Sequence, residues 1–148
     1  MIRPALIAVA AIAAPAQAGP LEVTSRVMVQ RQEAAADGTT RTRLAPAVRA
    51  VPGDRLTVVI AYRNSGRVPI ADLAIVNPVP PGLAYRGGAP GAPVPDVSVD
   101  GVRFARLADL TVAGRPAGGA DITHVRWRLA SPVAPGSGGQ FAFQAVLK

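Results

Sequence analysis

The stretch from residue 51 to residue 85 constrains the fold of this 148-residue chain more than any other part. Within residues 55–64, apolar side chains alternate with polar or small ones, and the apolar positions are Leu56, Val58, Ile60 and Tyr62. A period of two is typical of a β-strand that buries one face. Residues 64–66 (Asn-Ser-Gly) predict a turn, because these residue types tolerate a positive φ. A second strand is predicted over residues 68–76, before a proline-rich segment that cannot donate to a sheet ladder.

Short alternating segments of the same kind recur along the chain. Further strands are predicted over residues 21–33, 41–51, 97–104, 122–129 and 141–147. Pro46 interrupts the second of these, so that segment is predicted to be an edge strand. Glycine- and proline-rich composition predicts loops at residues 86–96 and 115–120. About seven to nine short strands without an amphipathic helix favour an all-β fold, an antiparallel β-sandwich.

The apolar phase of these strands predicts the core between the two sheets. Trp127, the only tryptophan, lies on the apolar phase of its strand and is interpreted as a core anchor. The predicted core residues are Leu56, Val58, Ile60, Tyr62, Val125, Trp127, Leu129, Phe141 and Phe143.

The N-terminus has the composition of a secretory signal peptide over residues 1–18. Arg3 precedes an apolar run that is too short to span a bilayer, and residues 16–18 have the A-x-A form of a cleavage site. Residues 19–148 are then expected to form a single domain with no transmembrane segment, exported to the periplasm or the extracellular space. The chain has no cysteine, which fits an exported domain held by its core rather than by disulfides.

Turn residues at fixed places along residues 48–86 resemble a known module. A P-G-D turn precedes the alternating strand, an N-x-G turn follows it, and a P-x-G turn with a later aromatic closes the stretch. The matching residues are Pro52, Gly53, Asp54, Asn64, Gly66, Pro80, Gly82 and Tyr85. The stretch resembles the conserved repeat domain of unknown function of bacterial surface proteins, although Asn77 stands where that family usually has aspartate. The resemblance implies an immunoglobulin-like sandwich in a secreted or envelope protein.

Few residues offer catalytic chemistry. His124, the only histidine, lies in a predicted strand, and no serine sits in a G-x-S-x-G elbow. A triad of His124 with Ser98 or Ser131 and an aspartate would need the fold to bring these groups together. The interpretation adopted is a structural or solvent-facing histidine, so no catalytic residue is predicted.

The carboxylates indicate turns rather than a metal site. They are dispersed, and no D-x-D-x-D-G loop of the kind that binds calcium occurs. Asp100 is predicted to serve a hairpin, and Asp54 and Asp121 are predicted to accept hydrogen bonds from turn amides. No metal-binding or cofactor-binding residue is predicted, and no cofactor is expected.

The formal net charge of +7 favours anionic partners through an attraction that salt screens. The candidate contacts with an anionic surface lie on the polar phases of two predicted strands: Arg55, Arg63, Arg126 and Arg128. If the two strands share a sheet, these arginines form one exposed basic face. Specific nucleic-acid binding is not expected, because the arginines do not alternate with exposed aromatic residues.

These observations predict an exported, non-enzymatic β-sandwich module with a binding or structural role in the bacterial cell envelope. The expected partner is an envelope protein or an anionic envelope polymer. One alternative is a periplasmic chaperone-like sandwich that binds a partner by strand addition at an open edge. A second alternative is a hydrolase that uses His124.

Overall fold

The structure, a computed structural model, describes residues 20–47 and 49–148, so the predicted signal peptide lies outside the described residues. Within these ranges the chain forms strands and two short 3-10 turns, η1 (Leu107–Asp109) and η2 (Gly119–Asp121), and no α-helix. None of its helical turns has the length and apolar character needed to cross a membrane. The strands are β1 (Leu21–Ala34), β2 (Thr40–Pro46), β3 (Arg55–Asn64), β4 (Ala74–Pro78), β5 (Leu83–Gly88), β6 (Asp96–Ser98), β7 (Thr111–Val112), β8 (Arg115–Pro116), β9 (His124–Arg128) and β10 (Gly138–Leu147).

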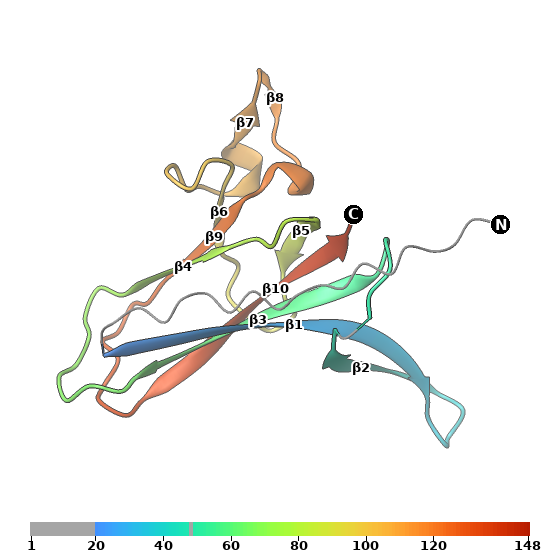
Figure 1. Ribbon diagram of the computed structural model, residues 1–148, viewed down its shortest axis with the longest axis horizontal. Coiled ribbons are helices and arrows are strands. Elements are labelled where there is room, and N and C mark those ends of the chain that lie inside the picture. Colours follow the sequence, from blue (N-terminus) through green and yellow to red (C-terminus); the bar gives the residue numbers. More distant parts are fainter. Residues whose placement is uncertain (1–19, 48) are drawn as a thin grey trace.

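Two antiparallel sheets carry the fold (Figure 1). The larger sheet has five strands in the order β2-β1-β3-β10-β5, and the smaller has three in the order β4-β9-β6. β7 and β8 form a separate two-stranded hairpin above the smaller sheet. The prediction of an all-β fold with antiparallel sheets is therefore confirmed.

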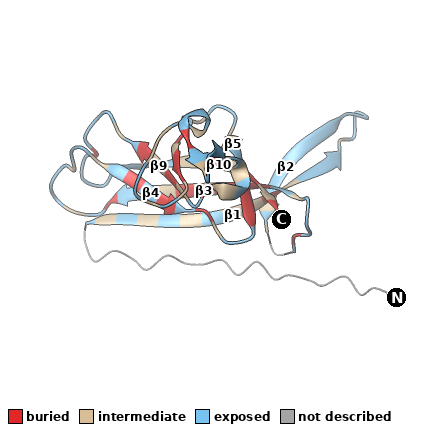
Figure 2. Ribbon diagram, turned by 90° about the horizontal axis from the view of Figure 1, so that it is seen from above, coloured by how far each residue is buried: buried red, intermediate tan, exposed pale blue. Residues whose placement is uncertain are grey.

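The inner faces of the two sheets share one hydrophobic core (Figure 2). Leu56, Val58 and Ile60 of β3 are fully buried, as the alternation predicted. Trp127 of β9 stacks on Phe141 of β10, with ring centroids 5.0 Å apart and planes 5° apart. The remaining predicted core residues are either buried (Val125, Phe143) or half-buried against the core (Tyr62, Leu129, Phe141).

The second predicted strand, residues 68–76, is wrong in its limits. β4 begins only at Ala74 and pairs with β9, so the chain leaves the larger sheet after β3 and enters the smaller one. Asp72 has a positive φ of 51°, which breaks an extended run before Ala74. The buried Asn64 side chain stabilises this passage of the chain from one sheet to the other, because its amide donates to the carbonyls of Val68 and Val133 at 2.8 and 2.9 Å.

The predicted loop over residues 86–96 also begins too early. β5 continues through Arg86 to Gly88, where it pairs with β10 at the edge of the larger sheet. Ala145 lies opposite Tyr85 and Gln144 lies opposite Gly87, so Arg86 is the extra residue of a β-bulge. A bulge bends its strand and redirects a side chain, and Gly87 allows it with a φ of 113°.

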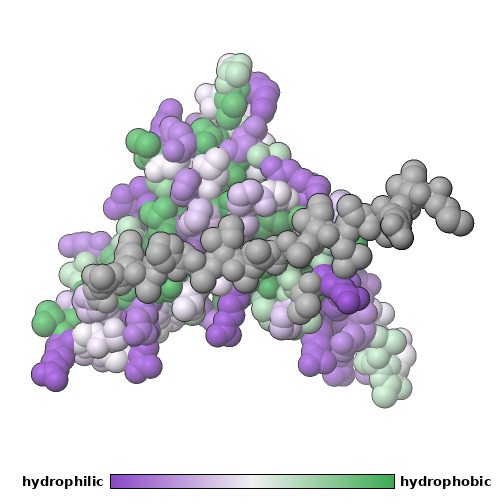
Figure 3. All heavy atoms as spheres, in the orientation of Figure 1, coloured by the Kyte–Doolittle hydropathy of each residue, from purple (hydrophilic) through white to green (hydrophobic). Residues whose placement is uncertain are grey.

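The other end of the larger sheet extends into an arm, defined here as residues 30–46. β3 pairs with β1 only as far as Val29, so the last part of β1 is paired with β2 alone. Most residues of the arm are exposed, and hydrophilic side chains gather on it (Figures 2 and 3). β2 ends at Pro46 and lies at the sheet edge, as predicted from that proline.

Candidate functional site

The candidate arginines do not form one face, because their strands belong to different sheets. Arg55 and Arg63 lie on β3 in the five-stranded sheet, whereas Arg126 and Arg128 lie on β9 in the three-stranded sheet. Each pair occupies the outer phase of its strand, and the sheets pack by their inner faces. The condition for a single basic face made of these four residues is therefore not met.

Arg126 is held by neighbours within the smaller sheet. Its guanidinium contacts the Asp96 carboxylate at 3.2 Å and lies over the Phe104 ring, 4.5 Å from the centroid. Its side chain is only 19% exposed. Arg126 is thus partly neutralised and covered, which leaves Arg128 as the exposed cation of this pair.

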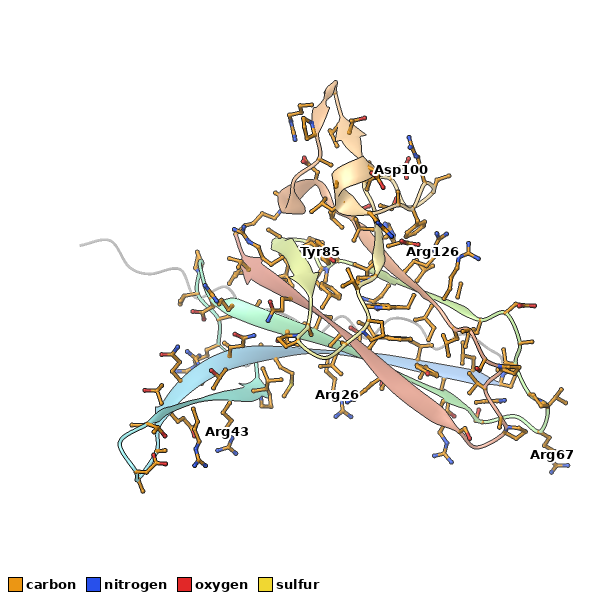
Figure 4. The ribbon with its side chains drawn as sticks, turned by 180° about the vertical axis from the view of Figure 1, so that it is seen from behind. Arg26, Arg43, Arg67, Tyr85, Asp100 and Arg126 are labelled. Atoms are coloured by element: carbon orange, nitrogen blue, oxygen red, sulfur yellow. The ribbon has the colours of Figure 1, made fainter. Side chains whose placement is uncertain are left out.

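The outer face of the five-stranded sheet carries other arginines. Arg26 of β1 stands directly opposite Val59 of β3, on the side of the sheet away from the core. Figure 4 shows Arg26 pointing away from the sheet on the side opposite the buried Tyr85. The exposed Arg86 of the β5 bulge completes a set that is defined here as the outer arginines: Arg26, Arg55, Arg63 and Arg86.

Two of these arginines border a hollow of about 510 Å³ on the outer face, here named the cationic hollow. Val146 of β10 is the register partner of Arg55 on one side, and Gln144 lies beside the bulge that contains Arg86 on the other. Within the described chain, neither arginine forms an ion pair. The residues that line this hollow include Gln30, Arg55, Arg86, Gln144 and Val146.

A second hollow, of about 500 Å³, adjoins the first and is here named the apolar hollow. The two hollows share Gln30 and Gln144 as lining residues. Leu44 of the arm borders the apolar hollow on one side, and the loop of residues 89–93 borders it on the other. Its floor includes Val59 and Ala142, which face each other across β3 and β10. The two hollows together are called the outer trough.

Of the residues considered for a catalytic triad, Ser98 lies close to His124 and is bonded within a turn. Ser98 pairs directly with His124 across β6 and β9. The Ser98 hydroxyl is fully buried, donates to the Asp100 carboxylate at 2.9 Å and accepts the Gly101 N–H at 2.9 Å. The Nδ1 of His124 lies 2.9 Å from the Thr123 hydroxyl instead. Ser131 is exposed between β9 and β10. These contacts build no proton path from Ser98 to His124.

The other aspartates singled out in the sequence serve turns, as predicted. Asp54 accepts the N–H of Val51, and Asp121 accepts the N–H of Gly118. Asp121 also receives a bidentate contact from Arg115 at 2.8 and 2.9 Å, and this contact lowers the pKa of its carboxyl well below the usual range. Asp100 has a lowered pKa because it accepts the N–H groups of Val102 and Arg103. In the described ranges, no three metal-ligating side chains come together.

Sequence reasoning found Arg55 but missed Arg86. The phase of the β3 alternation placed Arg55 outward, and that signal is local. Arg86 falls in the loop predicted from the glycine- and proline-rich composition of residues 86–96, but two of those glycines, Gly87 and Gly88, belong to the bulge and the end of β5. The aromatic Tyr85 just before Arg86 was the available signal that a strand runs through this stretch.

Comparison with known protein families, with curated proteins and with solved structures gives no match for this chain.

Proposed function

We propose that the protein is an exported, non-enzymatic, immunoglobulin-like β-sandwich module that binds a partner in the bacterial cell envelope. The observation that carries this proposal is the outer trough, which lies on the solvent side of the larger sheet between the arm and the loop of residues 89–93. Ligand sites are typically concave, with apolar walls and a few polar groups that converge. The trough combines both.

The rest of the molecule supports binding rather than turnover. The buried Ser98 hydroxyl and the Asp100 carboxylate are committed to turn contacts, and the Nδ1 of His124 contacts the Thr123 hydroxyl rather than Ser98. Export is supported by the signal-like residues 1–18. The immunoglobulin-like character is supported by the two antiparallel sheets and by the turn residues at 52–54 and 64–66.

The cellular location of the protein and the identity of its first residue test this proposal. Cells that express the full chain are fractionated, and the protein from each fraction is analysed by intact-mass spectrometry. We expect the protein in the envelope or the medium, with Gly19 as its first residue. A chain that stays in the cytoplasm with its N-terminus intact at Met1 or Ile2 contradicts the proposal.

Strand addition is a second candidate mode of binding, supported by an open sheet edge. β2 pairs with β1 only along residues 28–34 of β1. Within the described chain, residues 21–26 of β1 therefore pair with β3 on one edge and with no strand on the other. Such an edge can accept an added strand. Hydrogen exchange of the protein with and without envelope extract tests this candidate. Protection of amides in residues 21–26 by the extract supports it, and unchanged exchange there contradicts it.

A further inference from the structure

We propose that the outer trough binds an anionic amphiphile, with its phosphate or carboxylate head in the cationic hollow and its apolar chain in the apolar hollow. This inference deepens the proposed function, because it names the ligand class of the site on which that function rests.

The head-group end is defined by Arg55 and Arg86, which lie on either side of β10. Their strands are separated by two strand spacings, roughly 10 Å, which lets two long side chains reach one group between them. Guanidinium groups bind carboxylate and phosphate oxygens with several parallel hydrogen bonds. No carboxylate lines the cationic hollow, so the positive charge there has no internal counterion among the described residues.

The glutamines join the two ends of the trough. Gln30 donates to the Thr57 hydroxyl at 3.3 Å, which keeps its side chain over the outer face. Gln144 lies between Thr57 of β3 and Gly87 of β5 and lines both hollows. A ligand that extends from the arginines past these two residues therefore enters the apolar hollow directly.

The apolar end has walls suited to a hydrocarbon chain. Thr57 is almost fully buried and Val59 is half-buried although both lie on the outer phase of β3. Gln30 donates to the Thr57 hydroxyl, and Gln144 and Ala142 of β10 stand opposite Thr57 and Val59. Leu44 of the arm remains 44% exposed at the border of this hollow, and alanine and proline residues of the loop of residues 89–93 line the opposite border. Covering this surface with a hydrocarbon chain removes apolar area from water, which is the favourable term in such binding.

Simple probes test the contribution of the head group and of the apolar chain separately. Binding to the purified protein is measured by calorimetry for decyl phosphate below its micelle concentration, for decanol and for inorganic phosphate. We expect decyl phosphate to bind at least about tenfold more tightly than either partial probe, since only it uses both hollows. Similar affinities for the three probes, or no binding of decyl phosphate, overturn the inference.

Matched variants then assign the contacts. Arg55→Gln and Arg86→Gln are each expected to weaken decyl phosphate binding by about tenfold, the effect of losing one hydrogen bond to a charged group. Arg63→Gln is the control, because Arg63 lies on the same strand and face but lines neither hollow. Leu44→Ser is expected to weaken decyl phosphate and leave inorganic phosphate unchanged. An equal loss of decyl phosphate affinity in Arg63→Gln and in the trough variants overturns the inference.

Vesicles distinguish the source of the amphiphile. The protein is sedimented with phosphatidylcholine vesicles that contain or lack phosphatidylglycerol. Binding to the anionic vesicles that decyl phosphate displaces assigns the trough to a membrane lipid, and binding to decyl phosphate alone assigns it to a free amphiphile. These measurements use purified protein, so they remain informative if the export experiment fails.

Discussion

Trp127 of the smaller sheet contacts both the larger sheet and the loop of residues 89–93. It is buried to 3% exposure, stacks on Phe141 and donates from its indole N–H to the carbonyl of Pro93 at 2.9 Å. The last contact ties the loop of residues 89–93 to the core. The side chain that anchors the core therefore also positions the loop that borders the apolar hollow.

Trp127→Ala is expected to reduce the free energy of unfolding by roughly 3–5 kcal/mol, the range for deleting a large buried aromatic side chain. Trp127→Phe, which keeps a ring on Phe141 but loses the indole donor, should cost less. Urea unfolding monitored by circular dichroism measures both losses. A loss below about 1 kcal/mol for the alanine variant would show that this ring contributes little to the core.

The turn carboxylates predict a loss of stability in acid. Asp100 and Asp121 have folded pKa values below their ordinary value of 3.8, so the unfolded chain binds protons more readily than the folded chain. The contribution of these two carboxylates to the free energy of unfolding is complete above their ordinary pKa and is lost as the pH falls through the folded pKa. The thermal midpoint should therefore decrease as the pH is lowered below about 5.

Asp121→Asn should flatten this decrease, because an amide cannot form the charged bidentate contact with Arg115 at any pH. Asp109→Asn is the control, since the Asp109 carboxylate forms no ion pair within the described chain. Thermal unfolding between pH 3 and pH 7 compares the three proteins. A wild-type midpoint independent of pH in this range would show that the turn carboxylates do not contribute to stability.

At the scale of elements, one strand edge of the larger sheet is covered and another is open. η2 packs on β5 so closely that a Cβ atom on Gly119 would clash with the carbonyl oxygen of Tyr85. A covered edge cannot pair with another chain. At the opposite side of the sheet, residues 21–26 of β1 pair with β3 alone among the residues that the structure describes, and this is the open edge.

Gly119→Ala is expected to force η2 away from β5 and to lower the free energy of unfolding by about 1–3 kcal/mol, the usual cost of overpacking. Gly118→Ala provides the matched control, because the nearest atom to its added Cβ is the Asp121 carboxylate at 3.7 Å, an ordinary contact. Chemical unfolding measures the difference. Equal stability of the two variants would mean that the close approach of η2 to β5 can relax without cost.

The strands that the sequence predicts well are those whose pattern is local. β3 matches its predicted limits of residues 55–64, whereas β10 begins at Gly138, before the predicted strand of residues 141–147. The inner phase of both strands follows from residues such as Leu56 and Phe143. β5 was missed because its bulge at Arg86 and the two following glycines disturb the period of two. The pairing of strands was not predictable, since it depends on contacts between distant residues such as Asn64 and Val133.

The candidate site was predictable only in part for the same reason. The outward phase of Arg55 is a property of one strand, whereas the cationic hollow requires β3, β10 and β5 to be neighbours. The neutralisation of Arg126 requires Asp96, which lies thirty positions earlier in the chain and on another strand. Sequence patterns identify the side chains that face solvent, and the topology decides which of them act together.

At the scale of the whole molecule, the two outer faces differ in effective charge. None of the four outer arginines forms an ion pair within the described chain, although Glu22 is the register partner of Arg63. On the smaller sheet, Asp96 offsets Arg126. The two sheets pack by their inner faces, so a flat anionic surface can meet only one outer face at a time. The larger sheet should be the one that turns toward it.

The combined variant Arg26→Gln with Arg63→Gln, which leaves the outer trough intact, should therefore reduce sedimentation with anionic vesicles more than Arg126→Gln with Arg128→Gln. The difference should be clear at low salt and vanish at high salt, because the screening length falls from about 10 Å at 0.1 M to about 3 Å at 1 M. Neutral vesicles are the control. If the Arg126 and Arg128 variant loses as much binding, the smaller sheet also faces the membrane. Binding that is indifferent to salt and to both variants would remove long-range charge as the cause, because exposed arginines act on a distant surface only through the screened field.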